Sequence, residues 1–475
     1  MKRLCFLLLL LPALAACQWM TEDYDEDDFP DADAARYINI TVSVSAGSNP
    51  VTRAPLGGEY GDGVEKGLER ENAVKDITLI FYELAAGATL DNPGTATVSF
   101  VKKYDVHPAD NHNHTAPHTD APEGYNNEEV VYTTGDRRLD ETSLELGKTY
   151  HVLVVANADP MVVSGEPISE VRDKVSLLAY TGSGIGPDAS DFVMTSSADA
   201  TVKLDNPEVS VTENKYTYKF ECIHIERLAA RIDFWTKNGT FDSEHDGYKY
   251  TVGESGEFVV VTKVTPFNLY NEQEYLFKRV QDSWTATPPV VSYLGDETTT
   301  NYVVDPNTPN KDASHTSYNY LSQISTTLDA TYTVNMNASM DADQKFKVGG
   351  DDNIIIGYPK ENTLLPTSLL RQYATGLVFE TKYYVSEDAT TPVTRQYYYF
   401  LRHQGEKTEG VYEAKDINDF ASDPSTGEAK PMNFGIVRNN IYRVSVESFS
   451  PVEGNLKIRI EEKHWRHVDN PAIYL

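Results

Sequence analysis

An alternating pattern of apolar and polar residues stands out near the N-terminus. Its apolar members are Ile38, Ile40, Val42 and Val44, and polar residues lie between them. Successive side chains of a β-strand point to opposite faces, so this pattern predicts a half-buried strand over residues 37–45. The turn-forming residues 46–50 (Ala-Gly-Ser-Asn-Pro) end it.

Further runs rich in Val, Thr, Tyr and Phe are separated by turns containing Gly, Pro, Asn and Asp. Such runs favour strands over helices, and their spacing is typical of β-sandwiches. The strongest predicted strands cover residues 77–82, 96–101, 149–156, 215–220, 258–264, 377–385, 395–401 and 442–447. The long polar insertion at residues 296–315 is expected to lie on the surface. The chain is therefore predicted to be all-β.

The C-terminal stretch contains a second strictly alternating stripe. Its apolar positions are Leu456, Ile458 and Ile460, and Trp465, Val468 and Ile473 follow in the tail. One interpretation is that the stripe is the last strand of its own domain. The other is that residues 456–475 form a donor segment that completes a sheet in another copy. The pattern does not choose between the stripe and the tail as the donor.

The first 17 residues have the composition of an export signal. A basic start is followed by an apolar run and by Leu14-Ala-Ala-Cys17. This ending resembles the bacterial lipobox, in which the cysteine is acylated and becomes the new N-terminus. Acyl chains such as palmitate on Cys17 would hold the precursor on a membrane. Residues 18–36 contain all eight acidic residues of this N-terminal part and predict a solvated tether.

A basic residue follows the predicted N-terminal strand. Arg53 precedes Ala54 in a region expected to be an exposed loop, where proteolysis is easiest. Arg36 is a competing cleavage position, but a cut there leaves the strand attached to the subunit. Arg53 and Ala54 are therefore the predicted cleavage junction.

The composition excludes several function classes. The chain has 475 residues and a formal net charge of −31, which argues against binding to nucleic acid. It has no HExxH motif and no nucleophile elbow, so an enzyme is not expected, and no cofactor is implied. The histidines between His107 and His118 are close enough to suggest zinc or copper. A polar loop containing proline does not preorganise them, so no metal site is assigned.

Several blocks carry a resemblance to a known family. The lipobox at Cys17, residues 52–54 (Thr-Arg-Ala) and residues 74–82 resemble the N-terminal half of fimbrillins, the type V pilins of Gram-negative anaerobes. Residues 397–403 and 431–446 resemble the C-terminal domain of shaft subunits of short (minor) fimbriae. The resemblance implies two tandem transthyretin-like Greek-key β-sandwich domains with long surface loops.

The resemblance also implies a life cycle. The subunit is exported as a lipoprotein to the outer membrane, and an Arg-specific protease removes its N-terminal strand. The C-terminal segment of another pilin subunit then fills the vacated position, and the polymer becomes an extracellular fimbrium that supports adhesion to host or bacterial surfaces. Carried onto this chain, Arg53 is the cleavage position and Ile38 to Val44 form the removable strand.

The predicted organisation follows from these points. The signal covers residues 1–17, the tether 18–36, the removable strand with its cleavage loop 37–53, and the two sandwich domains 54–212 and 213–475. Two alternatives remain open. One is an anchor or tip subunit of the same fibre. The other is a non-polymerising β-sandwich lipoprotein that binds glycans or host proteins.

Overall fold

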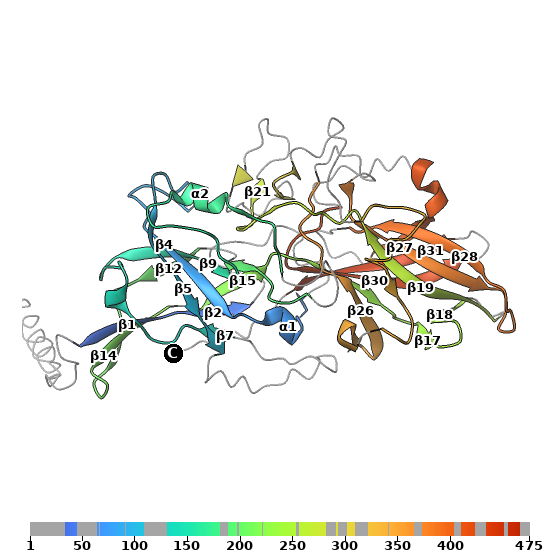
Figure 1. Ribbon diagram of the computed structural model, residues 1–475, viewed down its shortest axis with the longest axis horizontal. Helices are drawn as coiled ribbons and strands as arrows, with labels where there is room; N and C mark the ends of the chain where they lie inside the picture. The colour runs from blue at the N-terminus through green and yellow to red at the C-terminus, as the bar shows by residue number, and fades with distance from the viewer. Residues whose placement is uncertain are drawn as a thin grey trace, which may run out of the picture. The chain divides into compact units, whose positions relative to one another are not determined.

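The structure of the protein is a computed structural model (Figure 1). It describes residues 34–44, 64–65, 67–90, 92–108, 131–180, 189–196, 199–220, 222–252, 256–281, 291–292, 302–308, 322–340, 342–364, 373–402, 410–422, 434–450 and 455–465.

The described part of the chain is nearly all β, which confirms the predicted fold class. Its two α-helices are short, and they are α1 (Glu69–Asn72) and α2 (Ile168–Arg172). Single 3-10 turns occur at η2 (Leu139–Glu141), η4 (Ala342–Gln344) and η5 (Ile417–Ser422). Among these residues, no helix has the length and apolarity needed to cross a membrane.

A nine-stranded sheet forms the first large β layer. Its main path runs in the order β5-β4-β9-β11-β15-β2-β7-β6, and β12 pairs with β9 beside this path. The strands are β2 (Thr41–Val44), β4 (Asp76–Tyr82), β5 (Val98–Asp105), β6 (His107–Pro108), β7 (Val131–Thr133), β9 (Thr149–Ala156), β11 (Met194–Ser196), β12 (Ala200–Lys203) and β15 (Ile223–Arg227). The strand β4, next to the edge strand β5, is mostly apolar and buried, and its backbone pairs with β5 and β9 on its two sides.

A thirteen-stranded sheet contains most of the strands after residue 230. The path is β17-β18-β19-β27-β28-β29-β31-β30-β16-β26-β25, with β24 on β19 and β3 on β31. The strands are β3 (Val64–Glu65), β16 (Arg231–Trp235), β17 (Thr240–Asp242), β18 (Gly247–Val252), β19 (Glu257–Phe267), β24 (Val334–Asn335), β25 (Lys345–Val348), β26 (Asp351–Gly357), β27 (Gly376–Tyr384), β28 (Val393–Phe400), β29 (Gly410–Asp416), β30 (Asn440–Ser450) and β31 (Asn455–Trp465). Its inner face carries a large apolar cluster that includes Phe234, Phe379, Tyr442 and Ile458.

Smaller sheets complete the fold. A four-stranded sheet has the order β13-β14-β1-β8, a pair joins β10 to β20, and a three-stranded sheet has the order β22-β21-β23. Their strands are β1 (Ala35–Asn39), β8 (Arg137–Arg138), β10 (Val175–Ser176), β13 (Glu208–Ser210), β14 (Lys215–Lys219), β20 (Glu274–Tyr275), β21 (Val280–Gln281), β22 (Val291–Ser292) and β23 (Tyr302–Val303).

The chain divides into two compact units. Unit 1 comprises Met1–Asn39, Asp136–Lys148 and Lys203–Lys219, and it holds the four-stranded sheet. Unit 2 comprises Ile40–Gly135, Thr149–Val202 and Phe220–Leu475, and it holds both large sheets. The first large sheet continues past residue 213 to β15, so the exact limits of the two sandwich domains stay a prediction.

The polar insertion at residues 296–315 departs from its prediction. Its described part, 302–308, includes the fully buried residues Val303, Asp305 and Thr308. The Asp305 carboxylate accepts hydrogen bonds from the Thr363 backbone N–H at 2.8 Å and from the Thr363 hydroxyl at 3.2 Å. Asp305 is thus hydrogen-bonded in the interior, as buried polar groups generally are. Residues 302–308 therefore do not lie wholly on the surface.

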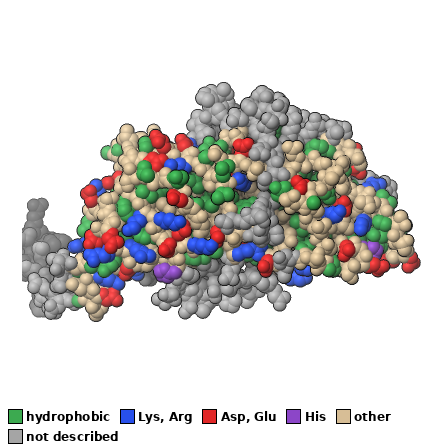
Figure 2. Space-filling view, in the orientation of Figure 1, with side chains coloured by type: hydrophobic (Ala, Val, Ile, Leu, Met, Phe, Trp, Pro, Cys, Tyr) green, Lys and Arg blue, Asp and Glu red, His purple; other side chains and the backbone are tan. Residues whose placement is uncertain are grey.

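The charged side chains are mixed on the surface. Figure 2 shows acidic and basic side chains interspersed over the visible face, with no continuous basic patch on it. This arrangement agrees with a solvated acidic surface.

Candidate functional site

The predicted N-terminal strand is present, but it is divided between two sheets. Its first part is β1, its second part is β2, and Ile40 lies between them. The side chains of Ile38, Ile40, Val42 and Val44 are each at most 3% exposed. The alternating stripe is therefore buried along its whole length, whereas its removable role stays a prediction.

The second part of this strand is paired on both sides. β2 runs parallel to β15, with Val42 opposite Ile223 and Val44 opposite Ile225. On its other side it runs antiparallel to β7, with Val42 opposite Tyr132. We call the place of β2 between β15 and β7 the β2 slot (Figure 1). Because both neighbours pair with β2, its departure leaves two unpaired strand edges.

Ile40 is bonded to the chain at the point where the strand changes sheets. Its backbone N–H donates to the Thr134 hydroxyl at 3.2 Å, and its carbonyl accepts from the Thr134 N–H at 3.0 Å. A single long strand was expected here. Alternation predicts which face of a strand is buried, but the partner strands determine where it changes sheet.

The first part of the strand lies in unit 1. β1 runs parallel to β14 and antiparallel to β8. The Asn39 amide donates to Asp136 at 3.0 Å, and Lys215 donates to the other oxygen of Asp136 at 3.0 Å. Burial raises the pKa of Asp136, but the hydrogen bonds from Lys215 and Asn39 outweigh this effect and leave the pKa below its usual value.

Arg36, the competing cleavage position, lies inside β1. It pairs with Tyr216, and its guanidinium carbon is 5.4 Å from the centre of the Tyr216 ring. A protease needs an extended, accessible backbone, so a cut at Arg36 requires prior opening of this sheet. This pairing counts against Arg36 as a cleavage position, and cleavage at Arg53 stays a prediction.

The C-terminal stripe belongs to a sheet of its own chain. Leu456, Ile458 and Ile460 lie on β31 and are at most 2% exposed. β31 is antiparallel to β30 on one side and to β29 on the other. The strand prediction is confirmed, and the buried stripe already fills the inner face of this sheet.

The other predicted site residues lie outside the described part of the chain. These are Cys17, Arg53, Ala54, Val468 and Ile473. Trp465 is the last residue of β31, and its side chain is not described. His107 begins β6, and the rest of the histidine cluster lies outside the described residues. Within the described ranges, no three His, Cys, Asp or Glu side chains are grouped so that they could hold a metal ion.

A buried ionic network adjoins the β2 slot. Glu71 of α1 forms an ion pair with Arg231 at 2.9 Å, and Arg231 forms a bidentate pair with Asp233 in which both N–O distances are 2.9 Å. All three side chains are fully buried. The Tyr358 hydroxyl also donates to Glu71. Buried charges need such partners, because an unpaired charge in the interior is strongly unfavourable.

Arg227, the last residue of β15, extends this network. Its guanidinium donates to the Glu71 carbonyl at 2.8 Å, to the Asn439 side chain at 3.0 Å and to the Asn72 side chain. Burial lowers the pKa of Arg227 to about 9, because desolvation disfavours the charged form. Sequence analysis did not assign a role to these residues. The available signal was a set of charges inside the apolar run of residues 223–234.

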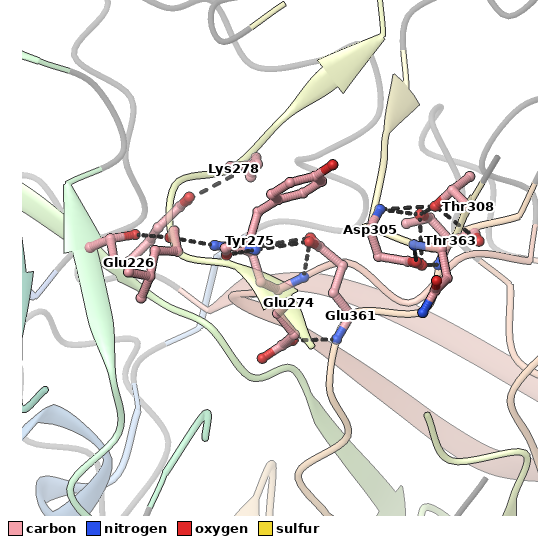
Figure 3. A network of polar contacts seen from close by, with 12 residues as sticks. Glu226, Glu274, Tyr275, Lys278, Asp305, Thr308, Glu361 and Thr363 are labelled. Carbon is pink, nitrogen blue, oxygen red and sulfur yellow. Dashed lines mark hydrogen bonds and ion pairs between the residues drawn. The ribbon is translucent and has the colours of Figure 1, made fainter. Parts of the chain in front are cut away.

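A second polar network contains Glu226, Glu274, Lys278 and Glu361 (Figure 3). Arg438 also belongs to it. Arg438 pairs with Glu361 at 2.9 Å, and the Glu361 N–H donates to Glu274 at 2.7 Å. Glu226 of β15 lies 3.4 Å from the Lys278 ammonium. Burial raises the pKa of Glu274 to about 8, and the neighbouring Glu361 charge adds to this shift. Glu274 is therefore largely protonated at neutral pH.

Comparisons with known proteins gave structural neighbours only. No family model matches the chain, and no curated protein matches it. The chain is similar to a candidate cell adhesion protein from Parabacteroides distasonis, with 12% identity, a TM-score of 0.40 and coverage of 91% of this chain and 100% of that one.

Two further neighbours come from Porphyromonas gingivalis. The tip fimbrial protein Mfa3 shares 10% identity, with a TM-score of 0.41 and coverage of 90% of this chain and 99% of that one. The fimbrillin FimA shares 14% identity, with a TM-score of 0.38 and coverage of 92% of this chain and 99% of that one. These neighbours include the kind of protein that the sequence resembles.

Proposed function

We propose that the protein is a structural subunit of a cell-surface fibre of the fimbrial type, and that it supports adhesion. The precursor is acylated at Cys17 and held at the outer membrane. Cleavage between Arg53 and Ala54 separates the N-terminal strand from the rest of the chain. An extended segment of another subunit then takes the place of that strand. No catalytic residue of this chain takes part.

The observation that carries this proposal is the burial of a strand that precedes the predicted cut. Four side chains, Ile38, Ile40, Val42 and Val44, are nearly fully buried. Burial of an aliphatic side chain contributes about 1.5–3 kcal/mol, so the four together contribute at most about 6–12 kcal/mol. A subunit without them exposes this apolar surface and four strand edges, two beside β1 and two beside β2. Both the surface and the edges favour the capture of another strand.

Within the proposal, the donor follows β31. Use of Leu456, Ile458 and Ile460 as donor side chains would remove them from the core of their own subunit, and β31 would lose its pairing with β29 and β30. Trp465 still belongs to β31, where it pairs with Glu65 of β3. The predicted donor side chains that follow this strand are Val468 and Ile473, in the tail after residue 465. We therefore assign the donor role to this tail.

The test compares Arg53→Ala with Arg36→Ala in cells that make the fibre. We expect the parent and Arg36→Ala proteins to be released as high-mass assemblies whose subunits begin at residue 54. Arg53→Ala should stay as uncut, membrane-bound monomer. N-terminal sequencing and size-exclusion chromatography provide the readout. Assemblies of Arg53→Ala that begin at residue 54 would refute the assigned cleavage position.

A separate result distinguishes the alternatives. An uncut, membrane-bound parent protein would favour an anchor subunit or a non-polymerising surface lipoprotein. A cut parent protein that stays monomeric with its partner subunits present would exclude the polymerising role.

A further inference from the structure

We propose that α1 is a clamp that holds the two walls of the β2 slot apart after β2 has left, so that the slot stays ready for an incoming strand. This inference rests on the proposed removal of the N-terminal strand. Its ligand is an extended segment of a second subunit with apolar side chains at alternating positions. The clamp residues are positioning residues, since they touch the walls and not the incoming strand.

The first wall, β15, is attached to α1 through Arg227. This side chain donates to the Glu71 carbonyl at 2.8 Å and also to the Asn72 side-chain oxygen. Both contacts are buried, and they fix the end of the strand whose residues Ile223 and Ile225 face Val42 and Val44. Hydrogen bonds from a charged donor are among the stronger ones. Both acceptors lie on α1, so this attachment does not depend on β2.

The second wall, β7, is attached to the same helix through Tyr132. The Tyr132 hydroxyl donates to the Asn72 carbonyl at 3.1 Å, and the contact is buried. Tyr132 is also the β7 residue that lies opposite Val42 of β2. Both walls of the slot are therefore hydrogen-bonded to two consecutive residues of α1, Glu71 and Asn72.

The helix itself is held independently of β2. Glu71 pairs with the buried Arg231 at 2.9 Å and accepts a hydrogen bond from the Leu68 N–H at 2.6 Å. The Asn72 side chain donates to the Gly67 carbonyl at 3.2 Å. α1 begins at Glu69, which is 69 − 53 = 16 residues after the predicted cut. Cleavage at Arg53 thus removes β2 and leaves the clamp in the chain.

The clamp keeps β15 and β7 from pairing with each other after β2 has been removed. Two unpaired edges that face each other across the width of one strand are driven to approach and pair. β7 is only three residues long, so its own sheet contacts offer little resistance. Fixing both walls to one helix prevents this collapse. A preorganised slot binds its strand more tightly because less ordering accompanies binding.

The test uses the full chain cut after Arg53, in which the N-terminal fragment is retained without a covalent link. A fluorescent synthetic peptide of residues 34–45 is the probe in trace amount, and fluorescence anisotropy follows its binding as the cut protein and its fragment are diluted together. The variant is Tyr132→Phe, which removes the hydroxyl and keeps the ring. The matched control is Tyr248→Phe on β18, which removes a hydroxyl that donates to Asp352 of β26 at 2.8 Å.

We expect the parent and Tyr248→Phe proteins to bind the probe equally well. Tyr132→Phe should bind it about tenfold more weakly, the loss that corresponds to one hydrogen bond. The thermal unfolding midpoints of the two uncut variants should differ little from each other, so that a general loss of stability does not explain the weaker binding.

The outcomes separate the two proposals. If the cut parent protein takes up no probe, the N-terminal strand is not exchangeable and the proposed function fails. If the parent takes up the probe and Tyr132→Phe binds it as tightly as Tyr248→Phe does, the removable strand stands and the clamp is refuted.

Discussion

Truncation of Ile40 tests whether the N-terminal strand opens as a unit of its own. Ile40 is 1% exposed and lies between β1 and β2. Replacing a buried isoleucine with alanine typically costs about 2–5 kcal/mol, because apolar contacts are lost and a cavity remains. Ile40→Ala should lower the free energy of opening of β2 by this amount and leave the backbone hydrogen bonds to Thr134 in place.

Native-state hydrogen exchange of the uncut chain measures this opening. Each 1.4 kcal/mol is a tenfold change in an equilibrium constant, so the β2 amides should exchange roughly 30 to 4000 times faster in Ile40→Ala. The amides of β9, in the centre of the same sheet, should change much less. Thr41→Ala is the control, because Thr41 lies on the opposite face of the strand and is only half-buried.

Two results would refute the reasoning. Equal acceleration in β2 and β9 would mean that β2 opens only when the whole sheet unfolds, so that it is not a separable element. An unchanged β2 rate in Ile40→Ala would mean that the apolar stripe does not hold the strand. The first result would also weaken the proposal that a single cut activates the subunit.

Two further predictions concern titrating carboxyl groups. The pKa of Glu274 is raised to about 8 from an ordinary 4.5, so the folded state loses stability as the pH rises from about 4.5 to 8. Glu274→Gln should remove this pH dependence of the free energy of unfolding, an effect of up to about 5 kcal/mol at pH 8. Chemical denaturation of both proteins at pH 5 and pH 8 measures it. The same loss of unfolding free energy between the two pH values in both proteins would contradict the prediction. Because the Asn39 amide helps to lower the pKa of Asp136, Asn39→Ala should raise that pKa, as measured by NMR titration. A carboxyl group with a lowered pKa stabilises the fold at high pH, so the stabilisation from the Asn39–Asp136 hydrogen bond should disappear as the solution is acidified. An unchanged pKa of Asp136 in Asn39→Ala would show that this hydrogen bond does not lower it.

The burial of the N-terminal stripe was predictable from sequence because alternation is a local signal. Period-two spacing at Ile38, Ile40, Val42 and Val44 determines which face is apolar, whatever the partners are. The partners themselves are set by residues far away in the sequence. Ile223 lies 223 − 42 = 181 residues from Val42. No local sequence pattern indicates that these two strands pair in parallel.

The C-terminal stripe shows a second limit. Alternation at Leu456, Ile458 and Ile460 correctly predicts a strand, but the same pattern suits a strand in its own sheet and a strand given to another subunit. Only the pairing with β29 and β30 assigns the stripe to its own core. The buried charges show a third limit. Arg227 and Arg231 would ordinarily be predicted to lie on the surface. Their partner Glu71 is 156 residues before Arg227 and 160 residues before Arg231.

The order of elements along the chain limits how activation can work. The proposed acylation site, the N-terminal strand and the proposed cut site precede α1, and the Glu71–Arg231 ion pair holds the helix in the interior. Had the helix preceded Arg53, the cut would remove the clamp together with the strand, and β15 and β7 would be free to close. With the helix after Arg53, the proposed single cleavage would release the N-terminal strand and leave α1 in the subunit. The same order requires the contacts of α1 to be complete before the cut, so a weakened clamp should impair strand capture after cleavage rather than export or cleavage of the precursor.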